Sequence, residues 1–318
     1  KIGYTEQEVD KRLKQQTYTA DVEYIEEWRG NAVFEDGSGE RFTDKDFHAY
    51  LIKNNVENKK KTEWFHIDKI KSKHMFYDFK ENRGVLEQND AVLPYELRSE
   101  QKKAVQMAKN YFETHEKGEF LWNAKPRFGK TLSVYDLCKA MNARSVLIVT
   151  NRPSIANSWY EDYKKFMGSE SGYLFVSSTE SLKGKPYVIS REEYLTYNRS
   201  QSKTENKKRC IEFLSLQDLK GSIYFGGNYD KLKHVKDMHW DLLVIDEAHE
   251  GIDTSKTDIA FNQITRNHTL HLSGTPFKAL ANDKFLQDAI FNYTYADEQN
   301  KKRKWNSPEQ NPYANLPQ

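Results

Sequence analysis

The 318-residue sequence has little cysteine, little net charge and no long hydrophobic run. Its two cysteines, Cys138 and Cys210, each lie in an apolar stretch, which argues against a disulfide-stapled secreted domain and favours reduced core thiols. No stretch reaches the roughly 18 consecutive apolar residues that a membrane span requires, and no signal peptide is visible. We therefore expect a cytoplasmic protein that has no membrane partner.

The remaining composition is that of a globular chain long enough for two or three domains. Hydrophobic residues make up 37% and charged residues 30% of the sequence. The formal net charge of +2 permits nucleic acid as a partner without demanding it. The first residue is Lys rather than Met, so we expect a fragment or a processed product.

Changes in the composition and hydrophobic pattern of the sequence divide the chain into three parts. Residues 1–82 are expected to form a small α+β domain, with a strand over 19–28, a helix over 43–54 and a short closing strand over 62–67. Residues 83–298 alternate short apolar strands with amphipathic helices, which predicts an α/β fold, a parallel sheet with helices on both faces. Residues 299–318 show no periodic pattern and are interpreted as a linker.

The stretch "WNAKPRFGKTLS", residues 122–133, ends a strand and begins a helix with Gly-Lys-Thr. This is the context of a phosphate loop, in which backbone N–H groups and the helix dipole favour phosphate. Lys130 would reach the β- and γ-phosphates, and Thr131 would ligate Mg²⁺. The alternative is a surface loop with a chance Gly-Lys-Thr. The predicted nucleotide-contacting residues are Ala124, Lys125, Pro126, Arg127, Phe128, Gly129, Lys130 and Thr131.

A second strand, in "DLLVIDEAHEG" (241–251), ends in acids. Acids at the carboxyl end of a strand, in a sheet that carries a phosphate loop, are expected near the ligand crevice. Asp246 can hold Mg²⁺, and Glu247 can orient and deprotonate an attacking water. The alternative is a polar strand end whose acids are solvated. Together the two stretches predict a nucleotide triphosphatase with Lys130, Asp246 and Glu247 as catalytic residues.

With Gly-Lys-Thr followed by Asp-Glu-Ala-His, the sequence resembles superfamily 2 helicases and translocases, most closely their restriction-enzyme-like branch. The other motifs are "LRSEQKKAV" (97–105), "VLIVTNRPSIANSW" (146–159), "FLSLQDLKG" (213–221) and "LSGTP" (272–276). The resemblance implies a RecA-like lobe that uses ATP and Mg²⁺. It assigns the remaining motif residues to adenine recognition (Arg98, Gln101), to the DNA backbone (Arg152, Ser154, Gln217) and to coupling of hydrolysis with movement (His249, Ser273, Thr275).

The same resemblance implies partners. DNA would be bound without sequence preference, and a second RecA-like lobe is expected outside this chain, along with restriction-modification subunits. We therefore interpret the chain as part of an ATP-dependent DNA helicase or translocase of a restriction or phage-defence system. An RNA helicase and a nucleotide-gated nucleic-acid-binding module without turnover stay open as alternatives.

The opening "KIGYTEQEVDKRLKQQT" resembles GIY-YIG-like nuclease domains, including the variant fused to bacterial helicases. The resemblance places Tyr4 in the second tyrosine motif, Arg12 at the phosphate-steadying position and Asp44 at the metal-binding position. His48 would share the helical face of Asp44, four residues away. The first strand of such a domain would precede Lys1, and the metal acid is Asp rather than Glu. Active nuclease and DNA-docking domain are both open.

Overall fold

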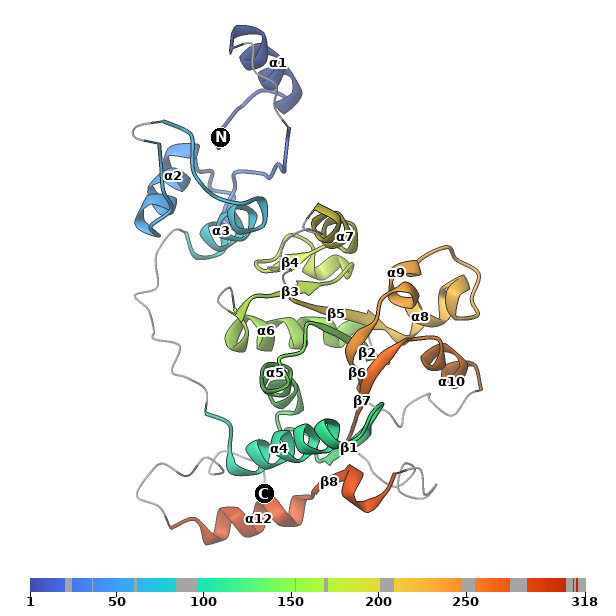
Figure 1. Cartoon of the computed structure of the whole chain (residues 1–318). Helices are drawn as coiled ribbons and strands as arrows, with labels where there is room; N and C mark the ends of the chain where they lie inside the picture. Colours follow the sequence, from blue (N-terminus) through green and yellow to red (C-terminus); the bar gives the residue numbers. More distant parts are fainter. Residues whose placement is uncertain are drawn as a thin grey trace. The chain divides into compact units, whose positions relative to one another are not determined.

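The computed structural model describes residues 1–20, 25–35, 37–59, 62–83, 96–151, 153–168, 171–200, 209–246, 255–274, 285–306, 311 and 313. The chain divides into two compact units (Figure 1). The first comprises Lys1–Pro94 with Gly184–Pro186, and the second Tyr95–Lys183 with Tyr187–Gln318. No described helix combines the length and apolar character that crossing a membrane takes.

The first unit is built around an aromatic core. Its helices are α1 (Val9–Ala20), α2 (Asp44–Lys53) and α3 (Lys69–Asn82). Thr43 and Asp46 form a capping box at the start of α2, and the Asp68 carboxylate accepts from the Lys71 amide, 2.9 Å, at the start of α3. Helices α2 and α3 and the irregular chain before α2 supply rings that pack edge-on and tilted: Phe34, Phe42, Phe47, Tyr50, Phe76 and Phe79.

The helix predicted over 43–54 is confirmed by α2. The strand predicted over 19–28 is wrong where the structure describes it, because residues 19 and 20 end α1 and residues 25–28 have no regular structure; residues 21–24 lie outside the described residues. The closing strand predicted over 62–67 is reduced to an isolated bridge between Asn58 and Phe65. In the described part of this unit the aromatic core is therefore formed by helices and irregular chain rather than by the predicted strands.

The second unit is an eight-stranded sheet in the order β4-β3-β5-β2-β6-β7-β1-β8, and every neighbouring pair is parallel. Helices lie on both faces (Figure 1). The strands are β1 (Glu119–Ala124), β2 (Ser145–Thr150), β3 (Tyr173–Val176), β4 (Val188–Ile189), β5 (Arg209–Ser215), β6 (Trp240–Asp246), β7 (Arg266–Ser273) and β8 (Ile290–Tyr293). The helices are α4 (Ser99–Thr114), α5 (Lys130–Ala140), α6 (Ala156–Phe166), α7 (Arg191–Ser200), α8 (Leu216–Gly221), α9 (Lys233–Asp237), α10 (Ser255–Asn262) and α12 (Tyr295–Lys304), with 3-10 turns η1 (Pro153–Ile155), η3 (Glu180–Leu182), η4 (Ile223–Phe225) and η5 (Gln287–Ala289).

The central strands are buried on both faces, which explains their near-continuous apolar sequences. On one face Phe120 and Trp122 of β1 join the core that α4, α5 and α6 complete. On the other, the buried Glu212 of β5 is bonded to Arg191 of α7 and His234 of α9. The predicted fold class, a parallel α/β sheet with helices on both faces, is confirmed. Cys138 and Cys210 are free and buried, as expected.

The end of the described chain differs from the predicted linker. Residues 299–304 form the second half of α12, and Tyr313 is only 3% exposed, packed on this unit. The helix is almost entirely polar, so it lacks the apolar period on which the prediction relied. Its start does carry a local signal, because the Thr294 and Asp297 side chains form a reciprocal capping box.

Candidate nucleotide-binding site

The segment between β1 and α5 turns sharply at two residues with left-handed backbone. Arg127 has φ 63° and Gly129 has φ 86°. The Phe128 amide donates to the Lys125 carbonyl, 3.2 Å, which closes the turn, and α5 then begins at Lys130 as predicted. No side chain within the described residues caps this helix at Gly129. The first amides of α5 therefore present the positive end of an eleven-residue helix at the carboxyl edge of the sheet.

The Lys130 side chain reaches back across the loop to the end of β1. Its Nζ donates to the carbonyl of Ala124, the last residue of β1, at 3.0 Å. Gly274, directly after β7, is close to both sides of the loop: a Cβ there would lie 3.6 Å from Lys130 Nζ and 3.7 Å from the Pro126 ring. Ser273, at the end of β7 and buried, pairs in register with Asn123 of β1. The structure thus brings the described part of the "LSGTP" motif, residues 272–274, against the loop between β1 and α5.

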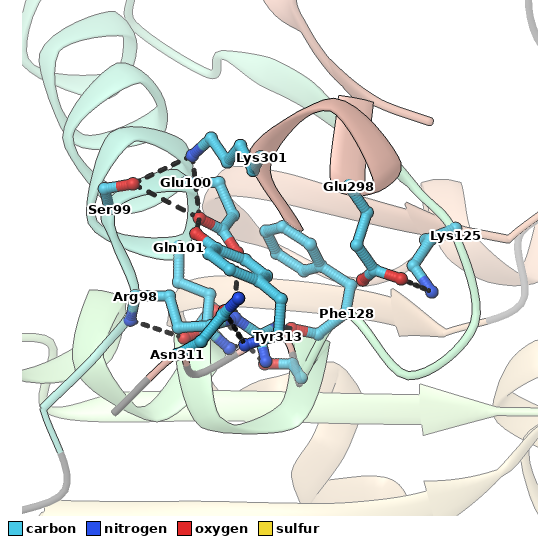
Figure 2. Close-up of polar contacts among 12 residues, drawn as sticks. Arg98, Ser99, Glu100, Gln101, Lys125, Phe128, Glu298, Lys301, Asn311 and Tyr313 are labelled. Atoms are coloured by element: carbon cyan, nitrogen blue, oxygen red, sulfur yellow. Dashed lines mark hydrogen bonds and ion pairs between the residues drawn. The ribbon is translucent and has the colours of Figure 1, made fainter. Parts of the chain in front are cut away.

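The start of α4 is bonded to the far side of the loop (Figure 2). Arg98 Nη2 and Gln101 Nε2 both donate to the Phe128 carbonyl, at 2.7 and 2.8 Å, and Gln101 Oε1 accepts from the Arg98 amide. Gln101 is fully buried, and a Cβ at Gly129 would come within 2.4 Å of its Nε2. The two predicted adenine-recognition residues therefore hold the loop itself, and Gly129 is required by close approach as well as by its φ.

The bulky residues of the loop have a packing explanation that sequence reasoning missed. The Phe128 ring is 0% exposed and packs against Phe291 and Tyr293 of β8, with centroids 5.8 and 5.3 Å apart. The Lys125 amide donates to the Tyr293 carbonyl, 3.1 Å. Arg127, by contrast, is exposed. The departure from small residues therefore anchors the loop to the edge strand of the sheet.

Asp246 ends β6 at the same edge of the sheet. It is half-buried, pairs in register with Thr150 of β2, and its Oδ2 accepts from Trp159 Nε1 at 3.3 Å. Since β7 alone separates β6 from β1 and all three strands are parallel, Asp246 and the loop lie roughly two strand spacings, about 10 Å, apart. A hydroxyl at Thr131 and a carboxylate at Asp246 are oxygen donors of the kind Mg²⁺ prefers, so the residues fit that ion.

Two of the predicted DNA-backbone residues follow neighbouring strands. Ser154 lies in η1, after β2, and Gln217 in α8, after β5, and both are exposed. Because β2 and β5 are paired in parallel, both residues lie at the carboxyl edge that carries the phosphate loop. The predictions for Arg152, Glu247, His249 and Thr275 lie outside the described residues.

In the first unit two of the four predicted residues, Tyr4 and Asp44, are in direct contact, and His48 contacts the chain two residues before Tyr4. The Tyr4 amide donates to Asp44 Oδ2, 3.3 Å, and His48 Nε2 is 2.8 Å from the Ile2 carbonyl, with its ring 4.9 Å from that of Phe65. Arg12 is exposed on α1 and makes no hydrogen bond to these residues in the described chain. Across the described ranges, no group of three or more His, Cys, Asp or Glu side chains is arranged to hold a metal ion.

An α/β lobe with a phosphate loop at the carboxyl edge of its sheet defines a class of nucleotide-binding proteins. Residues 94–278 match the family model described as "Type III restriction enzyme, res subunit". This match spans more than half of the chain, which therefore belongs to that family, and the second unit is a helicase-like RecA lobe. Residues 1–80 match a model described as "T5orf172 domain", so the family found there is not the GIY-YIG one named from sequence.

Two curated proteins are similar in sequence. The chain is 27% identical over 256 residues to the C-terminal part of a putative type II restriction enzyme and methyltransferase from Mycoplasma pneumoniae, covering 67% of this chain and 33% of that protein. It is 28% identical over 120 residues to the UvrABC system protein B of Latilactobacillus sakei, covering 38% and 18%. The chain thus spans a third or less of the length of these relatives.

Solved structures give weaker likenesses. The UvsW helicase from bacteriophage T4 is 14% identical, with a TM-score of 0.41 over 89% of this chain and 77% of that one. A nuclease-deletion mutant of the Type ISP restriction-modification enzyme LlaGI, in complex with a DNA substrate mimic, is 12% identical, with a TM-score of 0.46 over 64% and 18%.

Proposed function

We propose that the chain is the ATP-hydrolysing lobe of a DNA helicase or translocase in a restriction or phage-defence enzyme. The observation that carries the proposal is the shared edge of the sheet. Lys130, the uncapped start of α5 and Asp246 all lie at the carboxyl ends of β1 and β6, in a chain of the restriction-subunit family. An anion held at the start of α5 would therefore have a cation and an acid within reach.

The roles follow from the chemistry of each side chain. Lys130 exchanges its bond to Ala124 for the phosphates of ATP, while Ala124 to Thr131 enclose them. Arg98 and Gln101 keep the loop in shape, and Gln101 has a second N–H donor for adenine. Thr131 and Asp246 would hold Mg²⁺, which when bound neutralises phosphate charge. Glu247 orients the attacking water, and His249, Ser273 and Thr275 couple hydrolysis to movement.

DNA would contact the lobe through its backbone. Arg152, Ser154 and Gln217 follow adjacent strands and can donate to phosphates without reading bases. Binding should therefore be sequence-tolerant and should weaken steeply with salt. A second RecA-like lobe would complete the ATP site, and restriction-modification subunits would complete the enzyme. The chain alone is expected to bind nucleotide weakly and to hydrolyse it poorly.

The deciding experiment measures ATPase activity of the full-length protein with single-stranded DNA, double-stranded DNA or RNA. DNA should stimulate turnover, and Lys130→Ala should abolish it, whereas Lys103→Ala, an exposed lysine of α4, should not. Stimulation by RNA alone would favour the RNA helicase. Tight ATP binding without turnover would favour the nucleotide-gated module. Unchanged ATPase in Lys130→Ala would refute the site.

For the first unit we propose a nuclease centre at Tyr4, Asp44, His48 and Arg12. The hydrogen bond from the Tyr4 backbone amide to Asp44 favours it, because it holds the segment that carries the tyrosine at the acid expected to bind metal. The competing role is DNA docking without cleavage. Metal-dependent nicking of supercoiled DNA by the full-length protein, lost in Arg12→Ala but kept in Lys11→Ala, would establish the nuclease. Binding without nicking would leave docking.

A further inference from the structure

A buried carboxylate joins three segments beside the phosphate loop. Glu100 is 2% exposed and lies at the start of α4. It accepts from Arg98 Nε, from Lys301 Nζ of α12 and from the Tyr313 hydroxyl, each at 2.8 Å (Figure 2). Burial opposes its ionisation, but the hydrogen bonds from Lys301 and Tyr313 hold its pKa below the usual range. Its partners thus come from parts of the chain about 200 residues apart.

This carboxylate is one bond away from the loop. The Arg98 guanidinium gives Nε to Glu100 and Nη2 to the Phe128 carbonyl, 2.7 Å, so a single planar group bridges them. The Arg98 guanidinium carbon also lies 5.9 Å from the centre of the Tyr313 ring. The bonds from Lys301 and Tyr313 hold Glu100 in place, and Glu100 in turn orients the Arg98 guanidinium. Arg98 then positions the Phe128 carbonyl, which precedes Gly129.

The same helix reaches the other end of the loop. Glu298 of α12 is 0% exposed, and its Oε1 lies 2.8 Å from Lys125 Nζ, the side chain that follows β1. The pair is an ion contact rather than an aligned hydrogen bond, since neither Glu298 oxygen has a partner of hydrogen-bond geometry. Glu298 and Lys301 are three residues apart and share one face of α12. Helix α12 thus contacts one end of the loop directly, through Glu298 and Lys125, and is linked to the other end through Lys301, Glu100 and Arg98.

We propose that α12 together with Tyr313 is a positioning clamp for the phosphate loop, with Glu298, Lys301 and Tyr313 as positioning residues. These residues lie beyond the family match, which ends at 278. Because coupling between two sites is reciprocal, nucleotide in the loop would tighten α12 and Tyr313 by the amount that they tighten the loop. The order of α12 and Tyr313 would then depend on whether nucleotide occupies the site. This role rests on the proposed nucleotide site.

If these contacts were purely structural, their loss would destabilise the whole unit rather than the loop in particular. The first measurement is therefore hydrogen–deuterium exchange without nucleotide, which compares the loop with the rest of the unit. Lys301→Met removes one bond to Glu100, and Tyr313→Phe removes another while keeping the ring. The matched controls are Lys304→Met, exposed on the same helix, and Tyr229→Phe, 68% exposed in the same unit. Lys301→Arg should restore the bond.

In Lys301→Met, exchange in peptides covering residues 125–131 should become about tenfold faster, the size expected for one hydrogen bond to a charged group. Tyr313→Phe should give about fivefold, and the controls and Lys301→Arg should match the unaltered protein. Exchange in peptides of β2 and β6 should not change. Unaltered exchange at 125–131, or an increase spread evenly over the sheet, would overturn the clamp.

The second measurement is binding of ADP with Mg²⁺ by calorimetry. Lys301→Met should raise the Kd about tenfold, and ADP should slow exchange across 295–313 in the unaltered protein. Binding with neither effect would overturn the clamp while leaving the nucleotide site intact. Absence of any binding would instead refute the proposed function, and the exchange rates measured without nucleotide would still decide whether α12 holds the loop.

Discussion

Replacing Phe128 by alanine tests whether the phosphate loop is anchored by its own aromatic residue. The ring is fully buried between Phe291 and Tyr293. A buried phenylalanine removes about 200 Å² from water, which at about 25 cal/mol/Å² stabilises by roughly 5 kcal/mol. The loop can partly collapse into the space, so we expect a loss of about 3–5 kcal/mol. For a unit of this size, that lowers Tm by roughly 10 °C.

Thermal unfolding followed by calorimetry or near-ultraviolet circular dichroism gives this shift. Arg127→Ala is the matched control, because Arg127 is exposed and its left-handed backbone is equally strained for either side chain. Phe128→Leu should recover more than half of the loss. If Phe128→Ala and Arg127→Ala changed Tm equally, the ring would not anchor the loop, and the explanation of the unusual loop sequence would fail.

Three further outcomes are expected. Gly129→Ala should destabilise more than Gly226→Ala in urea unfolding: both glycines have left-handed backbone, but a Cβ would meet another side chain only at 129. Burial lowers the pKa of His268, so the contribution of the neutral ring to the free energy of unfolding is complete above the usual pKa and is lost as the pH falls through the lower folded pKa. When unfolding is measured between pH 8 and pH 5, the His268→Gln variant should therefore lose less stability than the unaltered protein. Burial raises the pKa values of Cys138 and Cys210 to about 12, so neither thiol should react with a thiol reagent at pH 8 until the protein is unfolded.

Local sequence was enough to locate the loop and six of the strands of the second unit, but not the short β4 or the edge strand β8. The apolar runs at 145–150 and 241–246 lie in β2 and β6, because a strand buried on both faces needs no polar alternation. The helix predicted to start at Lys130 does so, because Gly129 supplies the left-handed turn that precedes it. These features depend on residues that are close together in the sequence, so they can be predicted from the sequence alone.

Predictions failed where exposure or aromatic packing replaced periodicity. Residues 299–304 of α12 show no apolar period and are therefore predicted as linker, although the capping box at Thr294 and Asp297 that begins the helix is readable from the sequence. The stretch 19–28 alternates like a strand, yet residues 19 and 20 end a helix. In the first unit the rings that pack together come from well-separated positions, and their burial decides the local structure.

The sequence by itself predicted which residues could bind a phosphate and its metal: a lysine and a hydroxyl at the start of α5 and an acid at the end of β6. Only the tertiary structure decided how the loop is held. The contacts of Phe128 with Tyr293, Lys125 with Glu298 and Glu100 with Lys301 join residues that are far apart along the chain. These partners come together only when the sheet and its helices pack, so no local pattern in the sequence predicts which distant side chain will contact a buried ring or charge.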